Sequence, residues 1–243
     1  MKPHLKEQWC LPPGEPSGAF VAHMEDVLEV YHRPYDESKP VVCLDEVPKQ
    51  LVSEVRVPSP ARSGQPARCD YEYKREGVAN LFMISEPLVG WRHVQVTERR
   101  TAVDFAEVLR WVVEDLHPTA SRVVLVTDNL NIHGLGALYE AFEPERARRI
   151  VERLEWHYTP KHGSWLNVAE CELAALSTQC LNRRIGSMAR LKEVVAAWEE
   201  ERNELGIGVD WRFTTADARI VLRRLYPAPR MRWSTSRIRR NRF

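Results

Sequence analysis

Short apolar runs separated by turn-forming residues mark the strands expected in the first half of this chain. Residues 41–44, a run of valine, cysteine and leucine that follows Pro40, predict a buried strand that ends at Asp45. Two more strands are expected over 78–84 and 91–97, joined by a turn. These three strands predict an antiparallel meander. Residues 58–70, rich in proline, serine, glycine and arginine, predict a loop.

From residue 101 onward the apolar pattern alternates between helix and strand periods. Strands are expected over 123–127 and 154–158, and helices over about 18–31, 101–116, 135–153, 164–181, 187–204 and 216–225. Ser164 is expected to cap the helix that it begins. The order of the elements predicts an α/β fold, in which a mixed five-stranded sheet is flanked by helices and extra helices follow at the C-terminal end.

The composition is that of a folded protein. It argues against a membrane span, a secretory signal and a zinc site. Of 243 residues, 44% are hydrophobic and 28% are charged, and no apolar run is long enough to cross a membrane. The first residues carry charges and prolines where a secretory signal needs an apolar segment, so a cytoplasmic protein is expected. The five cysteines form no CxxC pair, which disfavours a zinc site and favours reduced thiols packed in the core.

The charge is distributed unevenly although the net charge is only +1. Residues 230–243 hold six arginines and no acid, so the rest of the chain is acidic. Such an asymmetry is expected where contacts with a polyanion are separated from metal-binding carboxylates. A solvated tail explains the same residues equally well, and the pattern alone does not decide between the two.

Two of the expected strands end in an acid, and this placement predicts a carboxylate site. Asp45 follows residues 41–44, and Asp128 follows residues 123–127. Ligands of open α/β sheets bind beyond the carboxyl ends of the strands, so the two carboxylates meet if the strands are parallel neighbours. Their mutual repulsion would be relieved by a hard divalent cation. The pattern does not decide between Asp45 and Glu46, because a strand buried on both faces has no sidedness.

A third acid is expected from the helix over 164–181. A spacing of about 100° per residue places Glu170 on the apolar, sheet-facing side and turns Glu172 toward the edge of the helix or solvent. An acid on the apolar side needs a metal or another cation. Acids at strand ends are also common for local reasons, since turns favour aspartate. The three acids together, in this order of elements, favour a functional site.

Three motifs carry a resemblance to a known family: VVCLDE at residues 41–46, VTDNLNIH at 126–133 and YTPKHGSWLNVAECE at 158–172. They resemble the DDE transposases of the mariner-like superfamily, in the bacterial insertion-sequence branch. DYEYKREGVANLF and DWRFTTADARIVLRRLYP add to the similarity, which covers nearly the whole chain. The resemblance implies an RNase H-like fold and an enzyme that cleaves DNA strands and transfers them during transposition of an insertion sequence.

The resemblance assigns Asp45, Asp128 and Glu170 as catalytic and metal-binding residues. It implies two Mg²⁺ ions, which Mn²⁺ could replace, with Asp45 bridging both ions and each of the other acids binding one. The implied partners are transposon ends and target DNA, bound by a homodimer or higher oligomer, with no membrane. The implied location is the bacterial cytoplasm, in association with the nucleoid.

Further residues near these motifs are candidates for supporting roles. Asn129 and His133 could orient water or phosphate, or serve only to cap and pack, and Asn167 is expected to have a local structural role. Lys161 and His162 could contact phosphate or be solvent-exposed, and Trp165 is expected to be interior. Four arginines of the tail are candidate DNA contacts: Arg237, Arg239, Arg240 and Arg242.

The family pattern also predicts the domain organisation. Residues 1–39 are expected to be a linker and helix after a missing DNA-binding domain, and 40–185 the RNase H-like catalytic domain. A helical extension over 186–229 and the basic tail 230–243 follow. Two alternatives stay open: a truncated, inactive remnant that binds DNA nonspecifically, and an RNase H-like nuclease that only hydrolyses DNA.

Overall fold

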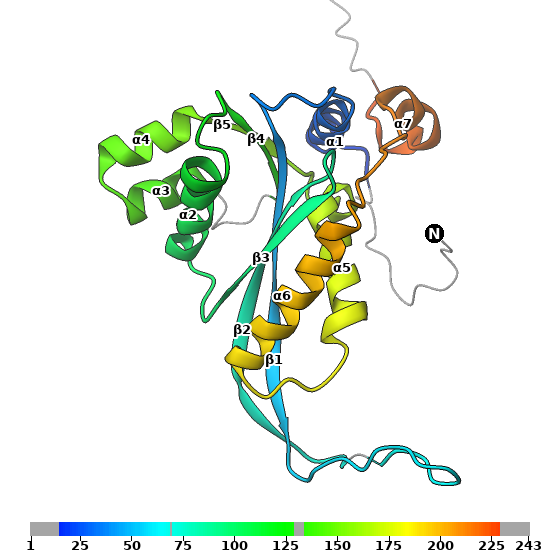
Figure 1. Ribbon diagram of the computed structural model, residues 1–243. Helices are drawn as coiled ribbons and strands as arrows, with labels where there is room; N and C mark the ends of the chain where they lie inside the picture. Colours follow the sequence, from blue (N-terminus) through cyan, green and yellow to red (C-terminus); the bar gives the residue numbers. More distant parts are fainter. Residues whose placement is uncertain (1–14, 69, 129–133, 229–243) are drawn as a thin grey trace, which may run out of the picture.

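A five-stranded sheet forms the centre of the computed structural model, which describes residues 15–68, 70–128 and 134–228 (Figure 1). The strand order is β3-β2-β1-β4-β5. β1 pairs antiparallel with β2, and β2 with β3, whereas β4 is parallel to both β1 and β5. The mixed sheet is therefore confirmed, with strands β1 (Val41–Glu54), β2 (Tyr73–Glu86), β3 (Trp91–Thr97), β4 (Val123–Thr127) and β5 (Leu154–Tyr158).

β1 is much longer than its apolar run, and the expectation that it ends at Asp45 is wrong. The strand continues to Glu54 because it pairs with β2 along nearly its whole length. The parallel pairing of β1 with β4 stops at Leu44. The expected end of β1 is therefore the point at which β4, one of its two neighbours, ends. Beyond Leu44, β1 is paired on one side only, and an edge of this kind accommodates Pro48.

β1 and β2 extend together into an arm that projects from the body of the sheet (Figure 1). β2 begins at Tyr73, five residues before the expected position, because its polar first half pairs with the exposed end of β1. The predicted loop joins them and holds two isolated antiparallel bridges, Ser59 with Arg68 and Arg62 with Gln65. Backbone pairing thus extends the strands past the hydrophobic pattern that predicts them.

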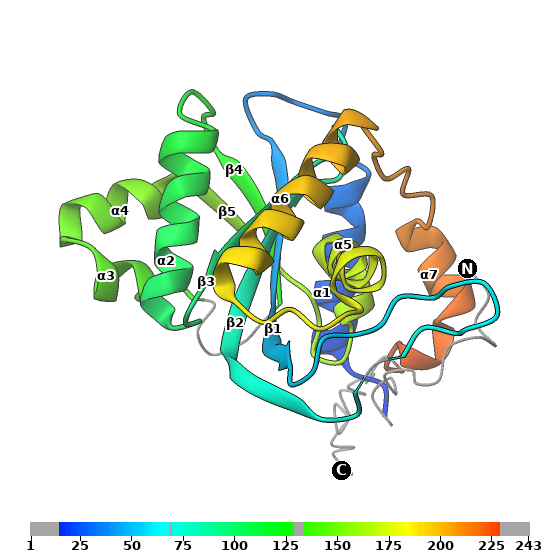
Figure 2. The same ribbon diagram turned by 60° about the horizontal axis from the view of Figure 1, so that its bottom comes forward.

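Helices cover both faces of the sheet (Figures 1 and 2). Alternate residues of β1 point to opposite cores: Val41 and Cys43 to one, Val42 and Leu44 to the other. On the first face lie α1 (Gly18–Tyr31), α5 (Val168–Leu176) and α6 (Met188–Glu204), with α7 (Thr215–Val221) against α1; on the second lie α2 (Ala102–Arg110), α3 (Leu135–Ala141) and α4 (Pro144–Glu152). None of the helices described here is long and apolar enough to span a membrane.

The helix over 164–181 is built from three pieces, unlike the single helix expected. A 3-10 turn, Ser164–Leu166, precedes α5, and a wider π-helical turn, Ser177–Leu181, follows it. The N-cap of α5 is Asn167, whose side chain accepts from the Ala169 N–H, so the expectation that Ser164 is the cap is wrong. The 3-10 turn has fewer residues per turn than an α-helix. The side chains that follow it therefore point in directions other than those predicted for one continuous α-helix.

A buried ion cluster joins α5, β3 and α6, and it corrects the prediction for Glu172. This carboxylate is 6% exposed and lies 3.2 Å from Arg92 and 3.0 Å from Arg202. Arg92, itself 2% exposed, also donates to the main-chain oxygens of Arg202 and Ile207. Glu172 points away from solvent because α6 and β3 cover the side of α5 that the helical pattern marks as exposed.

The thiols are only partly where the composition predicts them. Cys43 and Cys180 are buried and free, as expected of core cysteines. Cys171 is exposed, contrary to the expectation, because it lies on the outer side of α5. Cys10 and Cys69 lie outside the described residues.

Replacing Glu172 tests how much the buried ion cluster contributes to the free energy of unfolding. Glu172→Ala leaves Arg92 buried beside Arg202 with no carboxylate, and removing one partner of a buried pair costs about 3–5 kcal/mol. We expect a loss of that size in the free energy of unfolding measured by urea denaturation. Glu152→Ala removes an exposed pair with Arg148 and should cost under about 1 kcal/mol. Equal losses in both variants would contradict the prediction.

Candidate active site

Asp45 and its neighbour Glu46, between which the pattern does not decide, point to opposite faces of β1. Asp45 lies on the face of Val41 and Cys43, against which α5 packs. Glu46 lies on the other face, where Arg100 approaches its carboxylate to 3.5 Å. Only Asp45 therefore shares a face with the third candidate acid, Glu170.

Asp128 lies beside Asp45 at the carboxyl end of the neighbouring strand. β1 and β4 are parallel, and Leu44 pairs with Thr127, so the two aspartates occupy the next position on each chain. Adjacent strands are about 4.8 Å apart, which brings the two side chains within reach of a common ligand. Asp128 follows the alternation of Val124 and Val126, both in the core under α5, and therefore lies on the same face as Asp45.

Glu170 comes from the first turn of α5, on that same face of the sheet. The Ser164 hydroxyl donates to Glu170 Oε1 over 3.4 Å, a contact made by the 3-10 turn that precedes the helix. Neighbouring residues of the helix, Val168 and Ala169, pack in the core cluster that contains Cys43. The fold thus places acids from β1, the end of β4 and α5 on one face of the sheet.

Asn167 locks the start of α5 to β1 directly before Asp45. This fully buried side chain accepts from the Ala169 N–H over 3.1 Å and donates to the Leu44 carbonyl over 2.9 Å. Its expected structural role is therefore observed. Tyr31 acts beside it: its hydroxyl donates to the Leu166 carbonyl over 2.6 Å. Sequence reasoning missed this role of Tyr31, because the residue also fits the apolar stripe of its own helix.

Burial and neighbouring charges make Asp45 difficult to ionise. The pKa of Asp45 is raised to about 7, chiefly by burial and also by the negative charges of Asp128, Glu46 and Glu170, against the lowering effect of a hydrogen bond. That bond is donated by the Glu46 N–H to Asp45 Oδ1 over 2.8 Å. The negative charges of the neighbouring acids therefore add to burial in disfavouring the ionised form of Asp45.

The donor set fits a hard divalent metal, although its atoms are not arranged as a closed cage. Carboxylate oxygens are the ligands that Mg²⁺ and Mn²⁺ prefer. Among residues 15–68, 70–128 and 134–228, no group of three or more histidine, cysteine, aspartate or glutamate side chains is arranged to hold a metal ion. Repulsion among uncompensated carboxylates favours separated side chains, and a cation would draw their oxygens together.

The remaining candidate residues divide into exposed and undescribed ones. Lys161 and His162 are exposed on the turn before α5, and His162 has a left-handed φ of 67°. Trp165 is 40% exposed, so the expectation of an interior ring is wrong, because the 3-10 turn directs it away from the core. The candidates outside the described residues are Asn129, His133, Arg237, Arg239, Arg240 and Arg242.

The family to which this chain belongs follows from a comparison with family models. The model described as a DDE superfamily endonuclease matches residues 40–192, which include all five strands and the three candidate acids. The chain therefore belongs to the DDE endonuclease superfamily. A search of curated proteins finds no match.

Solved structures of the Mos1 mariner transposase share the fold. Its paired-end complex with Mn matches with a TM-score of 0.52 at 19% identity, covering 84% of this chain and 62% of that one. Its paired-end complex with the left transposon end gives 0.51 at 18% identity, with the same coverage of both chains. Its strand transfer complex gives 0.52 at 17% identity, covering 84% and 63%. The fold is thus the RNase H-like fold of these transposases, and this chain spans less than two thirds of their length.

Because Asn167 both caps α5 and bonds to the Leu44 carbonyl, we expect its replacement to destabilise the fold. Asn167→Ala removes an N-cap worth about 1 kcal/mol and leaves the buried Leu44 carbonyl without its partner, at about 1–3 kcal/mol more. We expect a loss of about 2–4 kcal/mol in the free energy of unfolding measured by urea denaturation. Ser187→Ala removes only the exposed cap of α6 and should cost about 1 kcal/mol. If Asn167→Ala lost no more free energy of unfolding than Ser187→Ala, the result would argue that the bond to the Leu44 carbonyl adds nothing to stability.

The raised pKa of Asp45 predicts a pH-dependent stability. Between its ordinary pKa of 3.8 and about 7 the folded state holds a proton that the unfolded state releases, so stability falls as pH rises through this window. In metal-free buffer at pH 8, Asp45→Asn should raise the free energy of unfolding by roughly 2–4 kcal/mol, and the gain should vanish near pH 4. Urea denaturation at both values measures it. A variant less stable than the wild type at pH 8 would contradict the prediction.

Proposed function

We propose that this chain is the catalytic part of a DDE transposase, which cleaves DNA strands in a metal-dependent reaction and joins the released 3′ hydroxyl to target DNA. The observation that supports the proposal is that Asp45, Asp128 and Glu170 lie on one face of the sheet in a domain of the DDE endonuclease superfamily. The shared fold with the Mos1 strand transfer complex supports the joining step.

The proposed metal ligands are the same three carboxylates. Two Mg²⁺ ions, or Mn²⁺ in their place, would supply Lewis acidity at the attacked phosphate and at the leaving oxygen. The protein's part is to present Asp45 from β1, Asp128 from β4 and Glu170 from α5 on rigid, packed elements. The Mn named for the related Mos1 complex fits this set of oxygen donors.

The proposed partners are transposon ends and target DNA, bound by a homodimer or a higher oligomer. Each Mos1 complex described above is named for a paired-end or strand-transfer assembly, and this supports two DNA ends acting together. We propose residues 40–185 as the catalytic domain, with residues 186–229 as a helical extension that packs on it through α6 and β3. We also propose that the arginines of the tail contact DNA and that the chain comes from an insertion sequence.

Amide substitutions of the three acids test the catalytic assignment. Asp45→Asn, Asp128→Asn and Glu170→Gln keep the side-chain shape and remove the charge that binds the metal, so each should abolish nicking of supercoiled plasmid DNA in Mg²⁺ or Mn²⁺. EDTA should abolish it in the wild type. Glu46→Gln, which alters the neighbouring acid on the opposite face, should keep nicking within about tenfold. Full activity in any of the three variants would remove that residue from the site.

A strand-transfer assay separates the proposed transposase from a nuclease that only hydrolyses DNA. A labelled oligonucleotide with a free 3′ hydroxyl is incubated with plasmid, the wild-type chain and Mn²⁺, and the covalent joint product is sought on a denaturing gel. The transposase proposal expects a joint product that Glu170→Gln does not form. Nicking without joining would favour the nuclease, and neither activity would favour the inactive remnant.

A further inference from the structure

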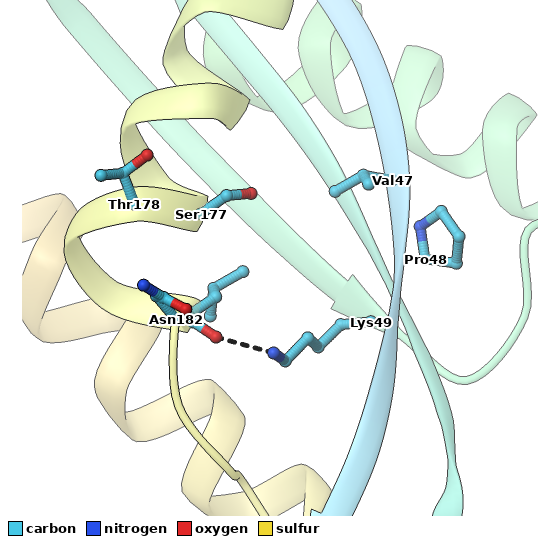
Figure 3. Close-up of a pocket in the computed structure, with 7 residues that line it drawn as sticks. Val47, Pro48, Lys49, Ser177, Thr178 and Asn182 are labelled. Carbon is cyan, nitrogen blue, oxygen red and sulfur yellow. Dashed lines mark hydrogen bonds between the residues drawn. The ribbon is translucent and has the colours of Figure 1, made fainter. Parts of the chain in front are cut away.

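A cavity beside the candidate active site has a lysine at its centre and no assigned role. It has a volume of about 300 Å³ and lies between β1 and the π-helical turn that follows α5 (Figure 3). The residues that line it are Val47, Pro48, Lys49, Ser177, Thr178, Leu181 and Asn182. Lys49 is the charged residue of this set, so the cavity is positive.

The cavity continues the face of the sheet that carries the catalytic acids. Asp45, Val47 and Lys49 alternate along β1 and therefore point to the same side. Four residues of strand span about 13 Å, a distance of a few nucleotides along a DNA strand. On the opposite wall, Ser177 lies seven residues after Glu170, which returns it to nearly the same side of the helix. Both walls thus lead from the carboxylates to Lys49.

Lys49 is held in position and still has a donor to offer. Its Nζ donates to the Leu181 carbonyl over 2.7 Å (Figure 3). It also approaches the Arg183 carbonyl at 3.4 Å. An ammonium group has three N–H donors, and the described part of the chain supplies these two acceptors. The carbonyls at the end of the helical turn anchor the charge, and no carboxylate lines the cavity to neutralise it.

We propose that this cavity binds a backbone phosphate of the DNA strand whose reacting phosphate lies at Asp45, Asp128 and Glu170. Lys49 supplies the positive charge, and the Ser177 hydroxyl and Asn182 amide supply hydrogen bonds at the rim. The inference rests on the proposed function, because it needs DNA at the carboxylates. It assigns a positioning role to Lys49: a phosphate held a few nucleotides away sets the register of the strand at the metal site.

The principal test measures DNA binding without catalysis, so that the pocket and the chemistry fail separately. Fluorescence anisotropy with a labelled DNA duplex in EDTA, between about 50 and 200 mM NaCl, gives Kd and its salt dependence. Lys49→Gln removes the charge but keeps a donor for the Leu181 carbonyl. Losing one phosphate contact should raise Kd about fivefold at 0.15 M salt and reduce the log–log salt slope by about 0.9. Lys49→Arg should restore both.

Two controls separate the pocket from general charge and from folding. Lys39→Gln makes the same charge change on an exposed lysine that lies just before the first residue of β1. This variant should leave Kd unchanged. Ser177→Asp places a negative charge in the cavity at an exposed position and should weaken binding, whereas Gln179→Glu adds the same charge outside the cavity and should have little effect.

The outcomes distinguish the inference from its alternatives. An unchanged salt slope in Lys49→Gln, with a loss only in the free energy of unfolding, would show that Lys49 merely caps the helical turn and would overturn the inference. Equal effects of Lys39→Gln and Lys49→Gln would overturn it as well. Wild-type protein that binds no DNA would overturn both this inference and the proposed function. Normal binding with no nicking would leave the pocket in place and reject the catalytic proposal alone.

Discussion

The repulsion among three carboxylates on one face of a sheet is the constraint around which this molecule is organised. Asp45 is surrounded by negative charge and cut off from much of the solvent, so its ionised form is costly in the folded chain. Such an arrangement persists only if the elements that carry the acids are held by other interactions. The stability of the surrounding frame therefore supports a site that by itself works against folding.

The frame consists of contacts that tie α5 to the sheet at both of its sides. Asn167 and Tyr31 fix the start of the helix through main-chain groups beside Asp45. The buried cluster of Glu172 with Arg92 and Arg202 fixes the same helix to β3 and α6. Two acids two residues apart thus have different surroundings: Glu172 pairs with two arginines and holds the helix, whereas Glu170 accepts a hydrogen bond from the Ser164 hydroxyl.

The same geometry places the cavity that contains Lys49 on the sheet face of the candidate active site. Because β1 continues past Asp45 as a strand paired on one side only, its sheet face and the end of the α5 segment enclose a cavity rather than a packed core. A shorter β1, ending where its apolar run ends, would leave Lys49 without this position. The extension of β1 by pairing with β2 therefore forms one wall of this cavity in addition to building the projecting arm.

The sequence by itself determined the order of the elements and the family, because these depend on local apolar periodicity and on motifs. Whether the strands that precede Asp45 and Asp128 are parallel neighbours was left open, and the pairing of β1 with β4 decided it. The starts of helices at Ser17, Thr101 and Thr214 were also local, since each cap bonds within three residues. The length of β1, the burial of Glu172 and the sharing of one sheet face by Asp45, rather than Glu46, with Glu170 were decided by tertiary structure. Each depends on which segment packs alongside, namely β2 beside β1 and α6 over α5, and a single chain segment contains no record of its neighbours.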